Sequence, residues 1–463
     1  MKLKYRFKNR YHNITYNVYE TENGIKVLYL DNPATVDFDF AILFKAGTSF
    51  ETKENVPKGT AHFLEHMLLN PNSTFKTKEE IDKFEQGNKT RPSLDINAST
   101  TKKNIYITSY TNQKGYMRAM ERVESILEFP KKKFASQIEK ERGIILAEKS
   151  RKLKKEKDSF LQSLIFLFNN EQEEFTYNIL GEEEDIKRIN INDLEKYFNS
   201  RFVTGNCVFA VQAKGEMSSR VKSKLESISK KIPYGVKDIP KKPVLKNRWK
   251  VGCFKDDRAS GVSFSFLYFN NAEEKIDYKL DVIQFLTGKL FSWLAFDILR
   301  EKKSLIYGFS PFRVRDLSFY YDISGFSFTT EGSKVLDTLN ELYAVIYDYT
   351  FHFLQTKKGR EWFDDAISRF IFPRSIKFSS DLAESDASSL IEDKEIFNDN
   401  KSVKAAKAIV IEDIQEYLKE MINIPPHIWI EGNINKKEIK DIVNKSLFGK
   451  RFNIKKPLPN NLK

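Results

Sequence analysis

The feature that most constrains the fold of this chain is a weak internal repeat. Residues 191–198 (Ile-Asn-Asp-Leu-Glu-Lys-Tyr-Phe) resemble residues 411–418 (Ile-Glu-Asp-Ile-Gln-Glu-Tyr-Leu), and the two stretches start 220 positions apart in a chain of 463 residues. Each has the apolar spacing of a helix, and each precedes an apolar strand that ends near a glycine, Gly215 or Gly432, before another charged helix. The repeat predicts two tandem copies of one domain of about 220 residues. The alternative is that helix, strand, glycine and helix recur by chance, as they can in any α/β protein.

The N-terminal residues predict strands, and helices follow them. Two apolar runs, 14–19 and 25–30, flank Asn23-Gly24, which is the strongest short-range signature of a β-hairpin. A third strand is expected over 38–44, and helices are expected over about 59–69 and from about 134 to past 151. Strands followed by helices with long connections indicate an α+β fold, in which a sheet packs against helices.

A segment rich in proline and lysine separates the two predicted domains. It contains Pro233, Pro240 and Pro243 together with four lysines, a composition typical of an extended, solvated linker. We therefore expect an N-terminal domain over 1–232, a linker over 233–248 and a homologous C-terminal domain over 249–463.

The chain is basic, but its charge does not identify a basic partner-binding element. It has 77 Lys and Arg against 64 Asp and Glu, a formal net charge of +13 and a pI near 9.2. Both signs are scattered along the chain, so we interpret the excess as a lysine-rich, solvated surface. The most basic run, 149–157, is expected to be a solvated extension of a helix. We find no zinc finger or basic amphipathic helix and expect no nucleic-acid partner, and we keep binding to nucleic acid or a membrane surface as an alternative function.

The cysteine count and the N-terminus bound the cellular setting. Two cysteines, Cys207 and Cys253, exclude a disulfide framework and a cysteine-based zinc site in a chain this long. No apolar segment follows the basic N-terminus, and no stretch approaches the roughly 18 apolar residues of a membrane helix. We therefore expect no membrane span, and the cytoplasm is the default compartment.

Two of the five histidines lie four residues apart, in Gly59-Thr60-Ala61-His62-Phe63-Leu64-Glu65-His66-Met67-Leu68. On a helix, His62, Glu65 and His66 share an arc of about 100°, with apolar residues opposite. Two imidazoles at this spacing can bind one zinc ion, and a neighbouring carboxylate can take a proton from the attacking water. This is the H-x-x-E-H order of the inverzincins. The simpler alternative is a helix whose histidines and glutamate make ordinary, partly buried hydrogen bonds.

A catalytic zinc also needs a third protein ligand. The best-placed downstream acids are Glu141 and Glu148, two turns apart on one face of a predicted helix. Ile144 and Ile145 are expected on the same side, which would bury this face in part, and a buried carboxylate needs a partner such as a metal. Taken alone, the segment is better explained by solvated glutamates on a charged helix.

These segments resemble the zinc region of the pitrilysin, insulysin and mitochondrial processing peptidase family. The similarity begins with Gly47-Thr48-Ser49-Phe50-Glu51 and continues through the H-x-x-E-H helix. The segment from Arg142 to Glu148 is similar to the family's glutamate-bearing helix, with Glu148 82 positions after His66. The resemblance implies that Glu148 is the third zinc ligand and that Glu141 does not bind the metal but contacts one of its ligands.

Two further segments carry the resemblance. Asn97-Ala98-Ser99-Thr100 is similar to the family's Asn-Ala-x-Thr strand edge, which implies that Asn97 and Ala98 bind an extended substrate as an added strand. Leu299 to Tyr307 is similar to a motif of the second half, and it implies that Arg300 and Tyr307 contact the substrate carbonyl. The chain departs from the family at Ser304, where the family has glycine, and in a longer segment over 86–95.

The resemblance implies a zinc metalloendopeptidase with one Zn²⁺ per chain, held by His62, His66 and Glu148. Glu65 would act as general base, and Arg300 or Tyr307 would stabilise the oxyanion. Two such domains make half of a clamshell, so the resemblance also implies a homodimer, or a heterodimer with a related subunit, that encloses peptides or unfolded segments. The alternative is a non-catalytic scaffold subunit of a heterodimer like the processing peptidase.

Overall fold

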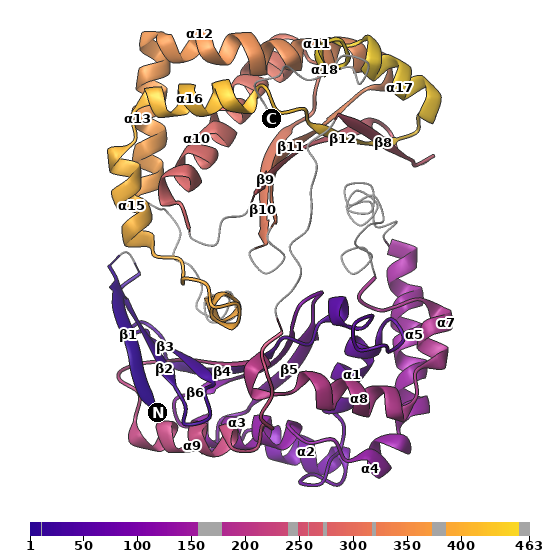
Figure 1. Cartoon of the computed structure of the whole chain (residues 1–463), viewed down its shortest axis with the longest axis vertical. Coiled ribbons are helices and arrows are strands. Elements are labelled where there is room, and N and C mark those ends of the chain that lie inside the picture. The colour runs from indigo at the N-terminus through magenta and orange to yellow at the C-terminus, as the bar shows by residue number, and fades with distance from the viewer. Residues whose placement is uncertain are drawn as a thin grey trace. The chain divides into compact units, whose positions relative to one another are not determined.

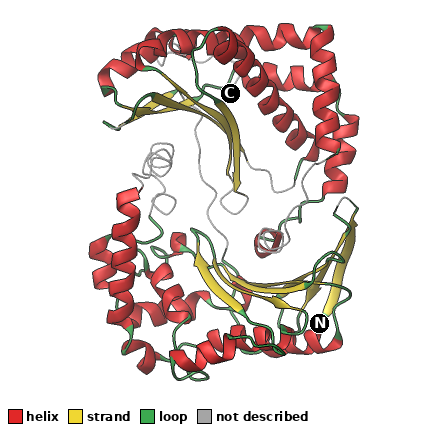
Figure 2. Ribbon diagram, turned by 180° about the vertical axis from the view of Figure 1, so that it is seen from behind, coloured by secondary structure: helices red, strands yellow, loops and turns green. Residues whose placement is uncertain are grey.

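The computed structural model describes residues 1–10, 12–155, 178–238, 249–257, 259–271, 276–316, 321–372 and 386–452. They form two compact units, each a sheet with helices packed on it, which confirms the α+β class (Figures 1 and 2). The first unit contains the described residues up to 238 together with 386–398, and the second contains 249–372 and 399–452. Residues 386–398 thus differ from the expected division, in which they belonged to the C-terminal half.

The first unit is built on a seven-stranded sheet with the strand order β1-β2-β3-β7-β4-β6-β5. All neighbouring strands are antiparallel except β3 and β7, which are parallel. The strands are β1 (Lys2–Asn9), β2 (Ile14–Glu20), β3 (Lys26–Asp31), β4 (Asp37–Phe44), β5 (Asp95–Thr100), β6 (Ile105–Asn112) and β7 (Cys207–Ala213).

The predicted hairpin and third strand are present. Strands β2 and β3 pair in register around a turn in which Gly24 has a φ of 87°, a left-handed conformation that favours glycine. The edge strand β1 was not among the predicted strands, although Leu3, Tyr5 and Phe7 alternate with basic residues at the two-residue period of a strand. The helices of this unit are η1 (Thr48–Phe50), α1 (Thr60–Leu68), α2 (Lys78–Glu85), α3 (Tyr116–Ile126), α4 (Lys131–Ala135), α5 (Ile138–Lys155), α7 (Glu183–Arg188), α8 (Ile191–Arg201), η3 (Thr204–Asn206) and α9 (Ser219–Ser229).

The two faces of this sheet are covered by different parts of the chain. One face packs against apolar residues of α1, α3, α8 and α9, which form the main core of the unit. The other face packs against Ala387, Leu390, Ile391 and Ile396, and residues 386–391 are helical. The first unit is therefore completed by a segment that follows most of the second unit in sequence (Figure 1).

The second unit has a five-stranded sheet with the order β10-β11-β9-β12-β8. Its strands are β8 (Lys250–Lys255), β9 (Val262–Asn271), β10 (Phe309–Asp316), β11 (Tyr321–Thr330) and β12 (His427–Gly432). Its helices are α10 (Tyr278–Ala295), η4 (Phe296–Lys302), η5 (Gly332–Lys334), α11 (Val335–Ala344), η6 (Val345–Tyr349), α12 (Thr350–Gln355), α13 (Lys357–Ile371), α15 (Asp399–Ala408), α16 (Ile411–Met421), α17 (Lys436–Lys445) and α18 (Leu447–Phe452).

The two sheets share one topology, which agrees with the tandem copies that the repeat predicts. Reading β3-β7-β4-β6-β5 beside β8-β12-β9-β11-β10 gives the same order of equivalent strands. In both sheets the second strand of this series is parallel to the first and antiparallel to the third. The repeated segments themselves are α8 and α16, which lead into β7 and β12. Helix α10 and its continuation η4 therefore occupy the place that α1 has in the first unit.

One helix among the described residues is long and apolar enough to cross a membrane by length and composition. It is α10 with its continuation η4, Tyr278–Lys302. We expected no stretch of this length and composition. The most apolar 18 residues of this helix are 56% buried inside the protein, and they contribute to the core of the second unit. A helix packed in this way is weak support for a membrane span.

The first part of the predicted linker packs on the first unit. The amide of Thr204 donates to the carbonyl of Pro233 (2.9 Å), and that of Gly205 donates to the carbonyl of Gly235 (3.0 Å). A Cβ on Gly205 would lie 2.4 Å from the amide nitrogen of Lys237, so this contact requires glycine. We expected the whole of 233–248 to be solvated. Tyr234 and Val236 are indeed 84% and 80% exposed, but the backbone of 233–238 is hydrogen-bonded to the first unit, and 239–248 lie outside the described residues.

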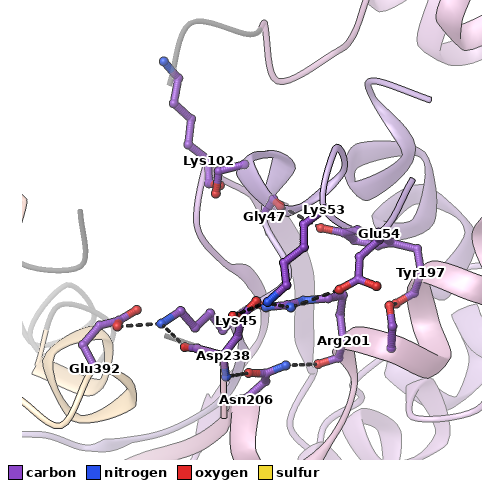
Figure 3. Close-up of polar contacts among 12 residues, drawn as sticks. Lys45, Gly47, Lys53, Glu54, Lys102, Tyr197, Arg201, Asn206, Asp238 and Glu392 are labelled. Carbon is purple, nitrogen blue, oxygen red and sulfur yellow. Dashed lines mark hydrogen bonds and ion pairs between the residues drawn. The ribbon is translucent and has the colours of Figure 1, made fainter. Parts of the chain in front are cut away.

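A buried cluster of charged side chains joins two segments, 233–238 and 386–398, to the end of β4 (Figure 3). The ammonium of Lys45, 1% exposed, lies 2.7 Å from Glu392 Oε2 and donates to the carbonyl of Asp238 (2.9 Å). The Asp238 carboxylate in turn pairs with Arg201 at 2.8 Å. The chain thus leaves the first unit after Asp238 and returns before Glu392 at the same buried lysine.

Candidate metal centre

Helix α1 places both histidines and the intervening glutamate on one face. Phe63, Leu64 and Met67 are fully buried in the main core, so the opposite side of α1 is turned toward α5. On that side, His62 is 6% exposed and Glu65 is 9% exposed. The amphipathic pattern of the sequence therefore produces a polar, nearly buried surface between two helices.

Glu148 of α5 completes a group of three side chains that could hold a metal ion. Its Oε2 lies 3.7 Å from His62 Nε2 and 3.5 Å from His66 Nε2. One ligand atom from each of the three residues lies within 4.8 Å of the other two. Tetrahedral zinc with ligands at about 2.0–2.1 Å separates them by about 3.3–3.5 Å. The donor set and its spacing therefore fit zinc with small adjustments.

Glu141 lies behind His66 rather than beside the three ligand atoms. Its Oε2 is 3.5 Å from His66 Nδ1, and it is 6% exposed. Burial raises the pKa of Glu141, but His66 and Asn70 outweigh it and the net shift is downward. A proton on Nδ1 directed at this carboxylate leaves Nε2 available as a ligand, which is the usual arrangement behind a metal-binding histidine.

The pKa of His66 is set by the carboxylates that surround it. Burial lowers the pKa of His66, but Glu141, Glu65 and Glu148 raise it, and the net shift is upward. The site without a metal therefore favours a cation at this position, as expected of residues that gather around a positive ion.

The face of α5 is less buried than the sequence indicated. Ile145 is 1% exposed and packs in the main core, but Ile144 is 40% exposed. The expectation that both isoleucines lie on the buried side was wrong for Ile144. Consecutive residues of a helix are about 100° apart, so only Ile145 points into the core.

Glu65 is held by the strand that the resemblance associates with substrate. The hydroxyl of Thr100, at the end of β5, donates to Glu65 Oε2 at 3.0 Å. Asn97 is exposed and Ala98 is 7% exposed on the same strand. Among the described strands β5 pairs with β6 alone and forms the edge of the sheet. Its outer edge is thus the one where an extended chain could add near Glu65.

Two basic residues of α5 fix the helix and were not identified as such from the sequence. Arg142 Nη2 donates to the carbonyl of Ile189 (2.8 Å), and its guanidinium lies over the ring of Phe63 in α1. Lys149 is 5% exposed and pairs with Glu182 at 2.9 Å. The expectation of a solvated run was therefore wrong for Lys149, because its partners lie more than thirty positions further along the chain.

Arg300 and Tyr307 lie in the second unit and are accessible. The Arg300 side chain is 48% exposed and stacks over Phe296 at 4.7 Å, and Tyr307 is 62% exposed. Arg300 belongs to η4, a π-helical segment, a feature that is frequent at functional sites.

A helix cap fixes the turn between Arg300 and Tyr307. The amide of Ser304, the first residue after the C-cap, donates to the carbonyl of Arg300 (3.0 Å), which is the bond of an αL cap, and the amide of Leu305 donates to the carbonyl of Leu299 (2.7 Å). Ser304 has a φ of 50°, which explains why glycine suits this position in the family.

Among its described residues, the second unit has no counterpart of the metal-binding group. His352 and His427 are the histidines of the sequence from 249 onward, and they are too far apart in sequence to repeat an i, i+4 pair. The helix equivalent to α1, α10 with η4, carries Arg300 instead.

Comparison with known proteins agrees with this difference between the two units. The model of the insulinase family of peptidases, family M16, matches residues 26–174, and the model of the peptidase M16 inactive domain matches residues 188–353. The first match contains the H-x-x-E-H helix and Glu148, and the two matches together cover more than half of the chain.

The chain is also similar to individual proteins. It is 28% identical over 216 residues to the mitochondrial-processing peptidase subunit beta of Mus musculus, which covers 42% of this chain and 39% of that protein. It therefore matches less than half of the length of this relative. It is 23% identical over 290 residues to a protein described as the uncharacterized zinc protease YmxG of Bacillus subtilis (strain 168), covering 62% of this chain and 68% of that one.

Solved structures show the same fold. Pitrilysin matches with a TM-score of 0.71 and 16% identity over 92% of this chain and 46% of that chain. The first half of the periplasmic protease PqqL from Escherichia coli matches with a TM-score of 0.71 and 15% identity, over 98% of this chain and all of that one. With the two domain matches, the shared topology and the sequence relatives, the chain belongs to the M16, or insulinase, family of peptidases.

Proposed function

We propose that this chain is a zinc-dependent endopeptidase whose metal is held by His62, His66 and Glu148. The observation that carries the proposal is the convergence of these three side chains, from two helices, within 4.8 Å of one another. Two imidazoles and one carboxylate are a ligand set of catalytic zinc sites, in which the fourth position is left for water or substrate. Zinc bound there would polarise the scissile carbonyl and acidify the attacking water.

Glu65 is proposed as the general base and then the general acid. Its carboxylate lies 3.9 Å from His62 Nε2, beside the metal position but outside the ligand group. Thr100 donates to one of its oxygens and so restricts its orientation. From there it can take a proton from the attacking water and return it to the leaving amine. No covalent intermediate is required.

The remaining predicted residues supply substrate contacts. The edge of β5 at Asn97 and Ala98 is suited to hold an extended peptide by backbone hydrogen bonds. Arg300 and Tyr307 are proposed to donate to the developing oxyanion. Their exposure is what contact with a substrate requires.

Substrates and partners follow from family analogy. We propose that the substrates are peptides or unfolded segments enclosed by a dimer, in which the zinc domain of one chain faces the Arg300 and Tyr307 domain of another. The partner is a second copy or a related subunit. Location in the cytoplasm stays a prediction.

The proposal is tested by incubating a pool of unstructured peptides with the purified chain and with Glu65→Gln. We expect cleavage that a chelator abolishes and that the substitution lowers by about 10²–10⁴-fold, because the general base is lost while the zinc ligands remain. Equal cleavage by both chains would refute the role of Glu65. A chain that binds zinc but cleaves no peptide, alone or with a related subunit, would favour the scaffold alternative.

A further inference from the structure

One buried carboxyl group beside α1 has no part in the chemistry proposed above. Glu51 is 0% exposed, although it lies in a polar loop between β4 and α1. We propose that Glu51 is a positioning residue of the metal centre, which caps α1 from outside the helix and so sets the location of His62. This inference rests on the proposed zinc site for its effect on the metal, but not for its effect on the helix.

Helix α1 needs a cap that its own sequence cannot provide. Its N-cap residue, Gly59, has a φ of 90° and no side chain, and the first turn contains no acidic residue. A Cβ at this position would lie 2.6 Å from the carbonyl oxygen of Leu180. The serine, threonine or aspartate that usually caps a helix is therefore excluded here, by close packing as well as by the backbone conformation.

Glu51 supplies the missing acceptors from eight residues upstream. Its Oε2 accepts from the amide of Gly59 at 3.0 Å, and its Oε1 accepts from the amide of Ala61 at 2.8 Å. Thr60, between them, donates from its backbone to the carbonyl of Pro57 at 3.3 Å. Ala61 is directly followed by His62, so the carboxyl group fixes the backbone one residue before the first zinc ligand.

The loop that carries Glu51 also holds the other side of the site. The amide of Gly47 donates to the carbonyl of Lys103 (2.7 Å), and that of Ser49 donates to Lys102 (2.9 Å). A Cβ on Gly47 would lie 2.3 Å from the backbone of Lys103, so the two segments are in direct contact. This turn follows Thr100, whose hydroxyl holds Glu65. One loop thus positions both α1 and the strand that orients the general base.

The arrangement has a functional consequence. The two histidines can approach a metal together only if the first turn of α1 is formed, because His62 is the third residue of the helix. Loss of the cap would let this turn fray and would weaken the ligand from His62 while leaving Glu148 in place. The buried location of Glu51 excludes direct contact with a bulky substrate.

Amide exchange of the zinc-free full-length chain tests the cap. We expect exchange in residues 60–63 to become about tenfold faster in Glu51→Gln, whose amide can accept from one of the two N–H groups but not from both. Glu51→Asp, which is shorter by one methylene, should show a smaller increase and serves if Glu51→Gln does not fold. Glu54→Gln is the matched control, since its carboxylate on the same loop pairs with Arg201. Exchange in residues 60–63 that is equal in Glu51→Gln, Glu54→Gln and the wild type would overturn the proposal.

Zinc affinity then tests the consequence for the site. Competition with a chelator should show a dissociation constant about tenfold higher for Glu51→Gln. Leu225→Ala, a buried position on α9, controls for a general loss of stability and should leave the constant within about twofold. A constant that rises equally in both would show that the effect is not local and would refute the positioning role. If the wild type itself bound no zinc, the proposed function would fail, while the exchange experiment would still decide on Glu51.

Discussion

Asp39 is a carboxyl group buried within the first sheet. It is 7% exposed, and its Oδ2 accepts a hydrogen bond from Gln212 at 2.8 Å. Its pKa is raised to about 6, because the increase caused by burial and by Asp37 exceeds the decrease caused by the hydrogen bond from Gln212. Because the native pKa exceeds the value of 3.8 in the unfolded chain, the native state binds the proton more tightly. The contribution of this group to stability is therefore complete below pH 4 and is lost as the pH rises through 6.

Replacement of Asp39 by asparagine should remove this dependence. We expect the free energy of unfolding of the wild type, relative to that of Asp39→Asn, to fall by about 1–3 kcal/mol between pH 4 and pH 6. Urea denaturation at a series of pH values measures it. Parallel pH profiles for the two proteins would contradict the assigned pKa.

Ser304 lies directly after the C-cap of η4, between Arg300 and Tyr307, and its backbone is strained. Its φ of 50° is a left-handed conformation that costs an L-residue about 1–2 kcal/mol relative to glycine. We expect Ser304→Gly to stabilise the protein by about 0.5–1 kcal/mol, since part of the gain is offset by the greater entropy of glycine in the unfolded chain. Thermal denaturation beside Ser304→Val, which should destabilise, provides the comparison. A lower melting temperature for Ser304→Gly would contradict this explanation.

The sequence predicts residues of the site well where the chemistry is local. His62, Glu65 and His66 share one helix face because of helix periodicity alone, and the structure places them together. Glu51 could not be predicted from pattern, because its role depends on a loop that returns to the helix. Lys149 was misinterpreted for the same reason, since its partners come from a distant part of the chain.

At the scale of elements, residues 386–398 are fastened to the first unit by two neighbouring ion pairs of different burial. Lys45 and Glu392 are 1% and 6% exposed, whereas Lys26 and Asp393, which also pair, are 30% and 61% exposed. Removal of one partner of a buried pair costs about 3–5 kcal/mol, and an exposed pair contributes about 0–1 kcal/mol.

We therefore expect Glu392→Gln to lower the free energy of unfolding by about 3 kcal/mol and Asp393→Asn by less than 1 kcal/mol. The double substitution Lys45→Met with Glu392→Leu should recover most of the loss, because it leaves no buried charge unpaired. Chemical denaturation of the four proteins measures these values. Equal effects of Glu392→Gln and Asp393→Asn would show that the buried cluster does not hold the segment.

The elements that were predicted are those with a clear local signal. The hairpin of β2 and β3 follows from Asn23-Gly24 between alternating runs, and the repeat predicted α8 with β7 and α16 with β12. Strand β1 was missed although its apolar and basic residues alternate as in a strand. The packing of 386–398 was missed because a long-range contact leaves no periodic pattern in the sequence.

At the scale of the whole molecule, duplication has produced two sheets of one topology with different site residues. The first copy carries the histidine pair and Glu148, and the second carries Arg300 and Tyr307 on the equivalent helix and the turn after it. The match of the second half to the M16 inactive domain agrees with this division. We infer that one copy supplies the metal site and the other supplies substrate contacts.

The most direct test of the account is a zinc titration of the metal-free chain with peptide cleavage as the readout. We expect activity to be absent at first, to rise in proportion to added zinc and to reach a plateau at one equivalent per chain. Glu148→Gln should need far more zinc to reach any activity, because one of three protein ligands is replaced by a neutral amide. Cleavage that persists without metal, or that is unchanged by Glu148→Gln, would contradict the assignment of His62, His66 and Glu148 as a catalytic zinc site.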